Sequence, residues 1–258
     1  MPFSIRKISA AIAIAAAALG GSLTLAAESG PSSGIASGIK NLAESLDLIT
    51  AIKAGKGPVN AIALQTALND ILDLSTEEVK NLELQLRSLE LPHEDRVAAQ
   101  TNYLSQLTGL RADIETMRAD MNKDARAEDI VKAAQALKLW RDAAYAPKIQ
   151  PIVDFAAVMQ GKKAIATAHA RLISIAREER KIRGFLVGGK AGPFLKLLKK
   201  AQGEIAQATQ MSAKAEELLD TPKDGEGSDL IDALTADANG LIDAAYGDFL
   251  AMSRLVSR

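Results

Sequence analysis

The sequence predicts an all-α fold, an elongated antiparallel helical bundle of about six to eight helices with coiled-coil-like seams. Residues that favour helices, such as Ala, Leu, Lys and Glu, are abundant, whereas aromatic residues make up only 3% of the chain. Apolar residues recur three and four positions apart, which places them on one face of a helix. The prolines stand at the ends of these periodic segments, where helices begin or stop, and no segment has the pattern of a strand.

The first 27 residues have the order of a secretory signal peptide. Arg6 and Lys7 precede an apolar run over 8–19, and the small residues of GGSLTLAA follow that run. This order predicts cleavage after Ala26 or Ala27. We therefore expect the protein to be exported, either to the periplasm or out of the cell.

An uncleaved membrane anchor is the alternative interpretation of this start. The stretch over 8–27 has about the 20 residues that span a bilayer, although small residues dominate it. The domain organisation that we expect is a signal peptide over 1–27, a flexible linker over 28–34 and one helical bundle domain over 35–258.

The composition excludes two classes of protein. Removal of 27 residues from 258 leaves 231, and the loss of Arg6 and Lys7 leaves 29 basic residues against 32 acidic ones, a net charge of −3. A chain with this balance is no bulk nucleic-acid binder, so no nucleic-acid partner is predicted. The chain has no cysteine, which excludes a disulfide framework and leaves helix packing as the source of stability.

The first three helices are predicted from their ends. A helix over 35–54 stops at glycines, and a second begins at Pro58. A third is predicted to begin at Ser75, because STEE fits a capping box in which Ser75 and Glu78 bond each other's backbone amides. It stops before Pro92, since proline disfavours helix at the preceding residue.

Prolines also divide the middle of the chain. A fourth helix extends to about Asn122, a fifth covers about 127–146, and a sixth runs from about Pro151 to Leu186. Trp140 lies in register with the apolar stripe of the fifth helix, so we expect it to anchor the core.

The last two helices are separated by the polar, breaker-rich turn over 220–229. One begins at Pro193, and the other has an acidic character from five aspartates. Their predicted seam residues are Phe194, Leu198, Ala201, Ile205, Ala208, Ala215 and Leu219, followed by Ile231, Leu234, Ala238, Leu241, Ala245, Phe249, Met252 and Val256.

Two segments have the spacing of enzyme motifs but lack their context. GFLVGGKA, over 184–191, has the glycines and lysine of a phosphate loop, yet Ala191 replaces the hydroxyl residue that binds magnesium and no strand precedes it. We interpret it as a helix end at which Gly188 or Gly189 adopts a positive φ. GPSSG, over 30–34, matches GxSxG, but it lies in the predicted linker.

Other catalytic constellations are also missing from the sequence. His93 and His169 have no helical carboxylate partner at a metal-binding spacing, so we expect them at surfaces or helix edges. Adjacent carboxylates such as Glu77 and Glu78 point about 100° apart on a helix and do not converge. We therefore expect no catalytic residue, metal or cofactor, and a protein that is not an enzyme.

One basic stretch remains as a candidate contact site. Residues 177–200 hold eight Lys and Arg against two Glu around an apolar centre. In one interpretation the apolar residues turn a helical hairpin into the bundle, and the charges stay in water, where the acidic last helix compensates them. In the other, the apolar residues face an anionic membrane. The candidate lipid or partner contacts are Arg183, Phe185, Lys190, Phe194, Lys196, Lys199 and Lys200.

These patterns favour an exported, non-enzymatic helical-bundle protein that serves as an interaction or structural module. Its partner would be another envelope or extracellular protein, or a second copy of itself. The alternative is a membrane-active protein that contacts anionic lipid through the basic, apolar hairpin tip at 185–195.

Overall fold

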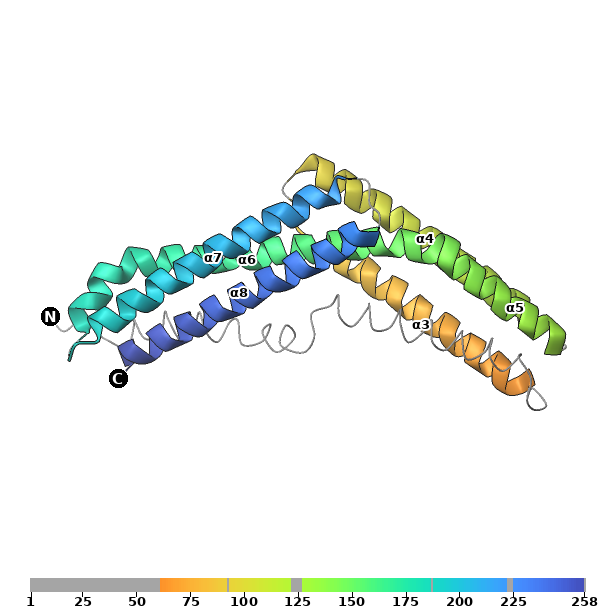
Figure 1. Cartoon of the computed structure of the whole chain (residues 1–258), viewed down its shortest axis with the longest axis horizontal. Coiled ribbons are helices and arrows are strands. Elements are labelled where there is room, and N and C mark those ends of the chain that lie inside the picture. Colours follow the sequence, from red (N-terminus) through yellow and green to blue (C-terminus); the bar gives the residue numbers. More distant parts are fainter. Residues whose placement is uncertain (1–60, 92, 122–126, 187, 222–224, 258) are drawn as a thin grey trace. The chain divides into compact units, whose positions relative to one another are not determined.

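The computed structural model describes residues 61–91, 93–121, 127–186, 188–221 and 225–257, and within these ranges it contains helices and no strand (Figure 1). The all-α prediction is confirmed for this part of the chain. The predicted signal peptide, the linker and the first predicted helix lie outside the described residues. The elements are α3 (Ala61–Arg87), α4 (Glu94–Met121), α5 (Ala127–Trp140), the π-helical segment η1 (Arg141–Tyr145), α6 (Ala146–Phe185), α7 (Ala191–Leu219) and α8 (Gly225–Ser257).

The described residues fall into two compact units, which we describe separately. The N-terminal unit comprises α3, α4, α5, η1 and the part of α6 that ends at Ala156. The C-terminal unit begins at Ala157 and comprises the rest of α6 with α7 and α8.

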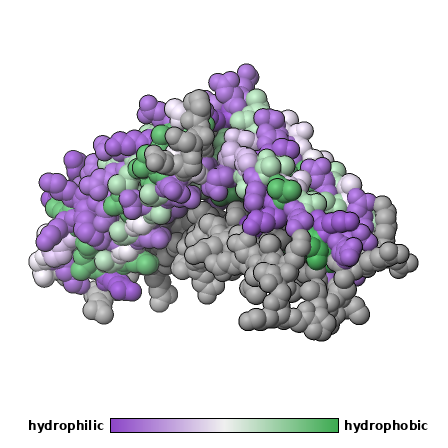
Figure 2. Space-filling view, turned by 45° about the vertical axis from the view of Figure 1, so that its right-hand side comes forward, coloured by the Kyte–Doolittle hydropathy of each residue, from purple (hydrophilic) through white to green (hydrophobic). Residues whose placement is uncertain are grey.

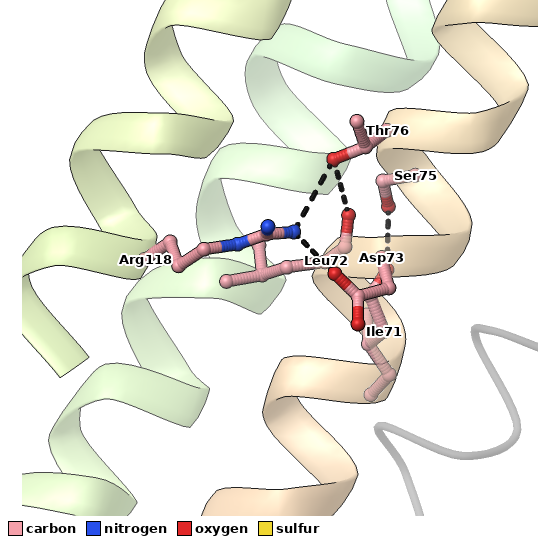
Figure 3. Close-up of polar contacts among 6 residues, drawn as sticks. All are labelled: Ile71, Leu72, Asp73, Ser75, Thr76 and Arg118. Atoms are coloured by element: carbon pink, nitrogen blue, oxygen red, sulfur yellow. Dashed lines mark hydrogen bonds and ion pairs between the residues drawn. The ribbon is translucent and has the colours of Figure 1, made fainter. Parts of the chain in front are cut away.

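Helix α3 runs without a break through Ser75, so the prediction that a new helix begins there is wrong. The Ser75 hydroxyl donates to the carbonyl oxygen of Ile71 at 3.0 Å, and the Thr76 hydroxyl donates to that of Leu72 at 2.7 Å (Figure 3). Both hydroxyls thus bond backward within their own helix, as Ser and Thr do in helix interiors. Ser75 is buried in the seam of α3, which continues past it to Val79.

Helices α3 and α4 pack antiparallel in the N-terminal unit. Arg118 of α4 bonds Asp73 at 2.5 Å and Thr76 at 3.5 Å (Figure 3). Arg111 of α4 lies 3.6 Å from Glu83 of α3. Numbers therefore rise along α3 as they fall along α4. The apolar residues buried between these helices and their neighbours include Leu68, Ile71, Leu72, Val79, Leu82 and Leu86 of α3 and Leu107, Leu110, Ile114 and Met121 of α4.

Helices α5 and α6 are continuous through η1, so the predicted break between Pro147 and Pro151 is absent. The Ala146 amide donates to the carbonyl of Arg141, five residues back, as in a π-helix. This wider turn immediately precedes Pro147, whose missing N–H interrupts the α-helical ladder in any case. Pro151 lies inside α6.

The C-terminal unit is built around one hydrophobic core to which all three helices contribute. A short turn joins α6 to α7, and its Gly188 and Gly189 have φ values of 66° and 78°, which confirms the predicted positive φ. The core residues are Ile165, Ala168, Leu172 and Ile182 of α6, Phe194, Ala201, Ile205 and Ala208 of α7, and Ala238, Ile242, Ala245, Phe249 and Met252 of α8.

Polar contacts at partly exposed positions also connect each pair of helices in this unit. Two are ion pairs, and the third places a guanidinium 5.3 Å from the centroid of a phenol ring, within the range of a cation–π interaction. These contacts are Lys162 with Glu216 (α6 to α7), Lys200 with Asp248 (α7 to α8) and Arg171 with Tyr246 (α6 to α8).

The two phenylalanines beside the α6–α7 turn should differ sharply in their effect on stability. Phe194 is 1% exposed in the core, whereas Phe185 is 56% exposed. We expect Phe194→Ala to lower the free energy of unfolding by about 3–5 kcal/mol, because it leaves a cavity. Phe185→Ala should change it by less than about 0.5 kcal/mol. Urea unfolding of residues 28–258, followed by circular dichroism, measures both, and equal losses would contradict this core.

Candidate functional site

The α6–α7 turn and the last turns of α8 lie at the same end of the C-terminal unit (Figure 1). The Lys200 ammonium contacts the Asp248 carboxylate at 3.1 Å, which sets these two residues at one level of the bundle. Beyond that level α7 runs back to Phe194 and α8 runs on to Met252, and both residues belong to the same core. The end of α6, the start of α7 and the last turns of α8 therefore lie together at this end of the unit.

We call residues 180–186, 188–203 and 249–257 the cationic end. None of these segments contains an Asp or a Glu. The cationic residues of this surface are Arg180, Lys181, Arg183, Lys190, Lys196, Lys199, Lys200 and Arg254.

Three of the seven contact residues predicted from the sequence are engaged inside the unit. Phe194 is a core residue and not a surface contact. Lys200 binds Asp248 and Glu204, and its hydrogen bonds to these carboxylates raise its pKa. Arg183 binds Glu179 at 3.0 Å within α6.

The other four predicted contact residues lie at the surface of the cationic end. Phe185 is 56% exposed, and Leu195, which the sequence interpretation did not select, is 37% exposed. Lys196 and Lys199 are exposed and Lys190 is half-buried. None of these three lysines has an ion-pair partner among the described residues. The end therefore combines exposed apolar side chains with uncompensated positive charge.

A second polar cluster, in the N-terminal unit, joins α3 to η1. The Tyr145 hydroxyl donates to the Glu78 carboxylate at 2.7 Å, and the charge of Arg141 acts on both groups. Tyr145 is 2% exposed and Arg141 is 6% exposed. Both residues belong to η1 and are buried.

Trp140, predicted to anchor the core, is only half-buried. Its ring lies 5.1 Å from that of Tyr145, and its indole N–H donates to Asp113 at 3.4 Å. The buried position belongs instead to Arg141, which follows the buried Leu137 by four residues. The sequence therefore contains one indication of this cluster, because Arg141 is a charged residue at a position of the apolar stripe. It does not identify Glu78 as the partner of Arg141.

Burial dominates the electrostatics of this cluster. It raises the pKa of Glu78, against the opposing effects of the Tyr145 hydrogen bond and the Arg141 charge. It also lowers the pKa of Arg141 and raises that of Tyr145, and the Glu78 charge raises the Tyr145 pKa further. Oxygen Oε1 of Glu78 is buried without a hydrogen bond among the described residues. These contacts attach α3 to the long α5–α6 helix through charges held away from water.

The described residues contain no group of three or more His, Asp or Glu side chains arranged to hold a metal ion. His93 and His169 are both exposed, as expected. Within the described ranges, every helix is too short or too polar to span a bilayer. Comparison with models of protein families, with curated proteins and with solved structures finds no match to this chain.

Glu78 should make stability depend on pH. Because its folded pKa lies above the usual 4.5, its contribution is fully present below 4.5 and is lost as pH rises through the higher, folded value. Glu78→Gln should remove this part of the decline in the free energy of unfolding. Urea unfolding between about pH 4 and about pH 8 measures it. Glu77→Gln, which removes the exposed neighbouring carboxylate, is the matched control, and an unchanged decline in Glu78→Gln would contradict the burial of this group.

Proposed function

We propose that this protein is an exported, non-enzymatic helical-bundle module that binds another envelope or extracellular protein, or a second copy of itself. The observation that carries this proposal is a set of large apolar side chains exposed on the N-terminal unit. Leu139 is 70% exposed, and Leu74 and Leu84 are each 59% exposed. Most of the described surface in the view of Figure 2 is hydrophilic, with hydrophobic patches between. Burial of these leucines by a partner would remove their apolar surface from water, which favours association.

The two exposed leucines of α3 are not part of its packing inside the unit. At 100° per residue Leu84 lies about 140° from the buried Val79 and about 160° from the buried Leu82. Leu74 lies on the flank of the helix, about 80° from Leu82. A partner helix with a similar apolar stripe would cover them. We also propose that the coiled-coil-like seams predicted from the sequence pack the helices within the bundle itself, and that the whole bundle has the predicted six to eight helices.

The spacing of buried residues supports the seam proposal, because it alternates between three and four. The buried residues of α7 that support it are Ala201, Ile205, Ala208, Ser212 and Ala215. Export of the module rests on the predicted signal peptide over 1–27.

Loss of the exposed leucines should weaken association. Residues 28–258 are examined by light scattering over a concentration series and by chemical crosslinking to purified envelope proteins. We expect a dimer or a crosslinked partner, and a dissociation constant that rises at least about tenfold in Leu74→Ser with Leu84→Ser. Ile173→Ser with Leu230→Ser, which removes two exposed apolar residues of the C-terminal unit, is the control. A monomer that captures no partner would overturn the proposal.

A second candidate function is contact with anionic lipid through the tip at 185–195. A specific observation favours it: Phe185 and Leu195 are exposed beside cations that have no acidic partner among the described residues. Apolar side chains flanked by Lys and Arg bind anionic bilayers through burial in the interface and through charge attraction.

Charge reversal at the tip should reduce flotation with phosphatidylglycerol-containing vesicles, and added salt should have a similar effect on the parent. Lys200 is left intact, because its replacement would also break the contact with Asp248. The test variant is Lys190→Glu with Lys196→Glu and Lys199→Glu. The control makes the same change of charge at exposed lysines elsewhere, with Lys80→Glu, Lys163→Glu and Lys214→Glu. Equal flotation of the two variants would rule out the tip as the lipid contact.

A further inference from the structure

The geometry points to an end-on contact, and we propose that the C-terminal unit meets an anionic phospholipid bilayer with its cationic end, to which the last turns of α8 contribute. The three helices of the unit then stand away from the bilayer plane instead of lying in it. This inference rests on the second candidate function and adds the orientation and the contribution of α8.

The first argument is charge complementarity. The eight basic residues of the cationic end and its lack of acids give it a charge of +8, whereas the whole chain carries −1, so the rest of the chain carries −9. The acids that adjoin the cationic end, Glu178, Glu179, Glu204 and Asp248, pair with Lys181, Arg183 and Lys200. The other five cations of this end therefore supply the charge that is free to attract an anionic surface. A negatively charged surface attracts this end of the unit and has no electrostatic attraction for most of the remaining protein surface.

The second argument concerns α8. Arg254 is exposed and has no ion-pair partner among the described residues. The sequence after Asp248 contains no further acid. Arg254 therefore adds to the charge of the α6–α7 tip, although it lies more than 50 residues away in sequence.

The third argument is a comparison with the side-on geometry, in which α6 lies along the bilayer. The outer face of α6 has no acid between Asp154 and Glu178, and it exposes Lys163, Arg177 and Ile173. Its two cations are 14 residues apart, or roughly 21 Å along the helix. The cationic end has five cations without an ion-pair partner among the described residues, against these two.

The cationic end carries both free cations and the two exposed apolar side chains of the tip. Among the described residues, the cations of the cationic end without an ion-pair partner are Arg180, Lys190, Lys196, Lys199 and Arg254. Phe185 is the last residue of α6, and Leu195 lies in the first turns of α7. Aromatic and aliphatic side chains at such a position enter the interface while the cations stay at the headgroups.

Single labels distinguish the two orientations, because the chain has no native cysteine. Cysteine replaces Gly192 at the cationic end, Ala170 on the outer side of α6, or Ala236 on α8, all of which are exposed. Each variant of residues 28–258 carries an environment-sensitive fluorophore and is mixed with phosphatidylcholine and phosphatidylglycerol vesicles that contain a lipid-bound quencher. We expect quenching at position 192 alone. Quenching at 170 would establish the side-on geometry and overturn the proposal.

The contribution of α8 is tested by Arg254→Glu. We expect at least about fivefold weaker partition into the same vesicles, from the loss of one cation and the gain of one anion at the surface. Arg87→Glu, at the exposed end of α3, is the matched control and should bind like the parent. If the parent binds and Arg254→Glu binds equally, α8 takes no part and only this inference fails. If the parent binds neither these vesicles nor phosphatidylcholine alone, the lipid function itself fails.

Discussion

Burial of one apolar stripe per helix is the constraint on which the described structure depends. The chain has no cysteine, and the described residues contain no metal cluster, so each long helix is held by the side chains that it buries against its neighbours. In the C-terminal unit this burial relies largely on small residues, among them Ala201, Ala208 and Ala245, which are fully buried. Small side chains allow the helices to approach closely, and long charged side chains tie the helices together beside the core.

The same constraint determines which residues remain for function. Once Phe194 and Met252 fill the core near the α6–α7 turn, the neighbouring cations must stay in water, because an unpaired charge cannot enter an apolar interior without a large desolvation cost. Some of them find carboxylates, as Lys200 does with Asp248 and Glu204. The cations that do not find one produce the positive potential of the cationic end.

The N-terminal unit departs from this pattern at one place, the cluster of Glu78, Arg141 and Tyr145. Removing a carboxylate from water raises its pKa, and a nearby cation and a phenol hydroxyl offset only part of that cost. The cluster coincides with η1, the π-helical segment within the long α5–α6 helix. A polar contact inside an apolar seam fixes one register of α3 against that helix, since any slip would separate the buried groups.

Sequence periodicity by itself determined that the described chain is helical and which faces are apolar, because the 3.6-residue period is a local property. It also determined the glycine-rich end of α6, since Gly188 and Gly189 can adopt a positive φ without strain. Local sequence patterns gave wrong helix boundaries at two places where tertiary packing determined the structure. Ser75 has the sequence of a cap, yet it lies in a seam that packing extends through it, and Pro147 follows a π-turn that lets the helix continue.

The candidate sites depended on tertiary structure more than the helices did. The sequence grouped the basic residues of 177–200, and it placed Phe194 both in a helix seam and among the candidate contacts. Only the structure shows that Phe194 is enclosed while Phe185 is exposed. The sequence also could not place the last turns of α8 at the end of the unit where that stretch lies, or Glu78 beside Tyr145, 67 residues away. Contacts between distant segments follow from which helices are neighbours, and a local period carries no information about that choice.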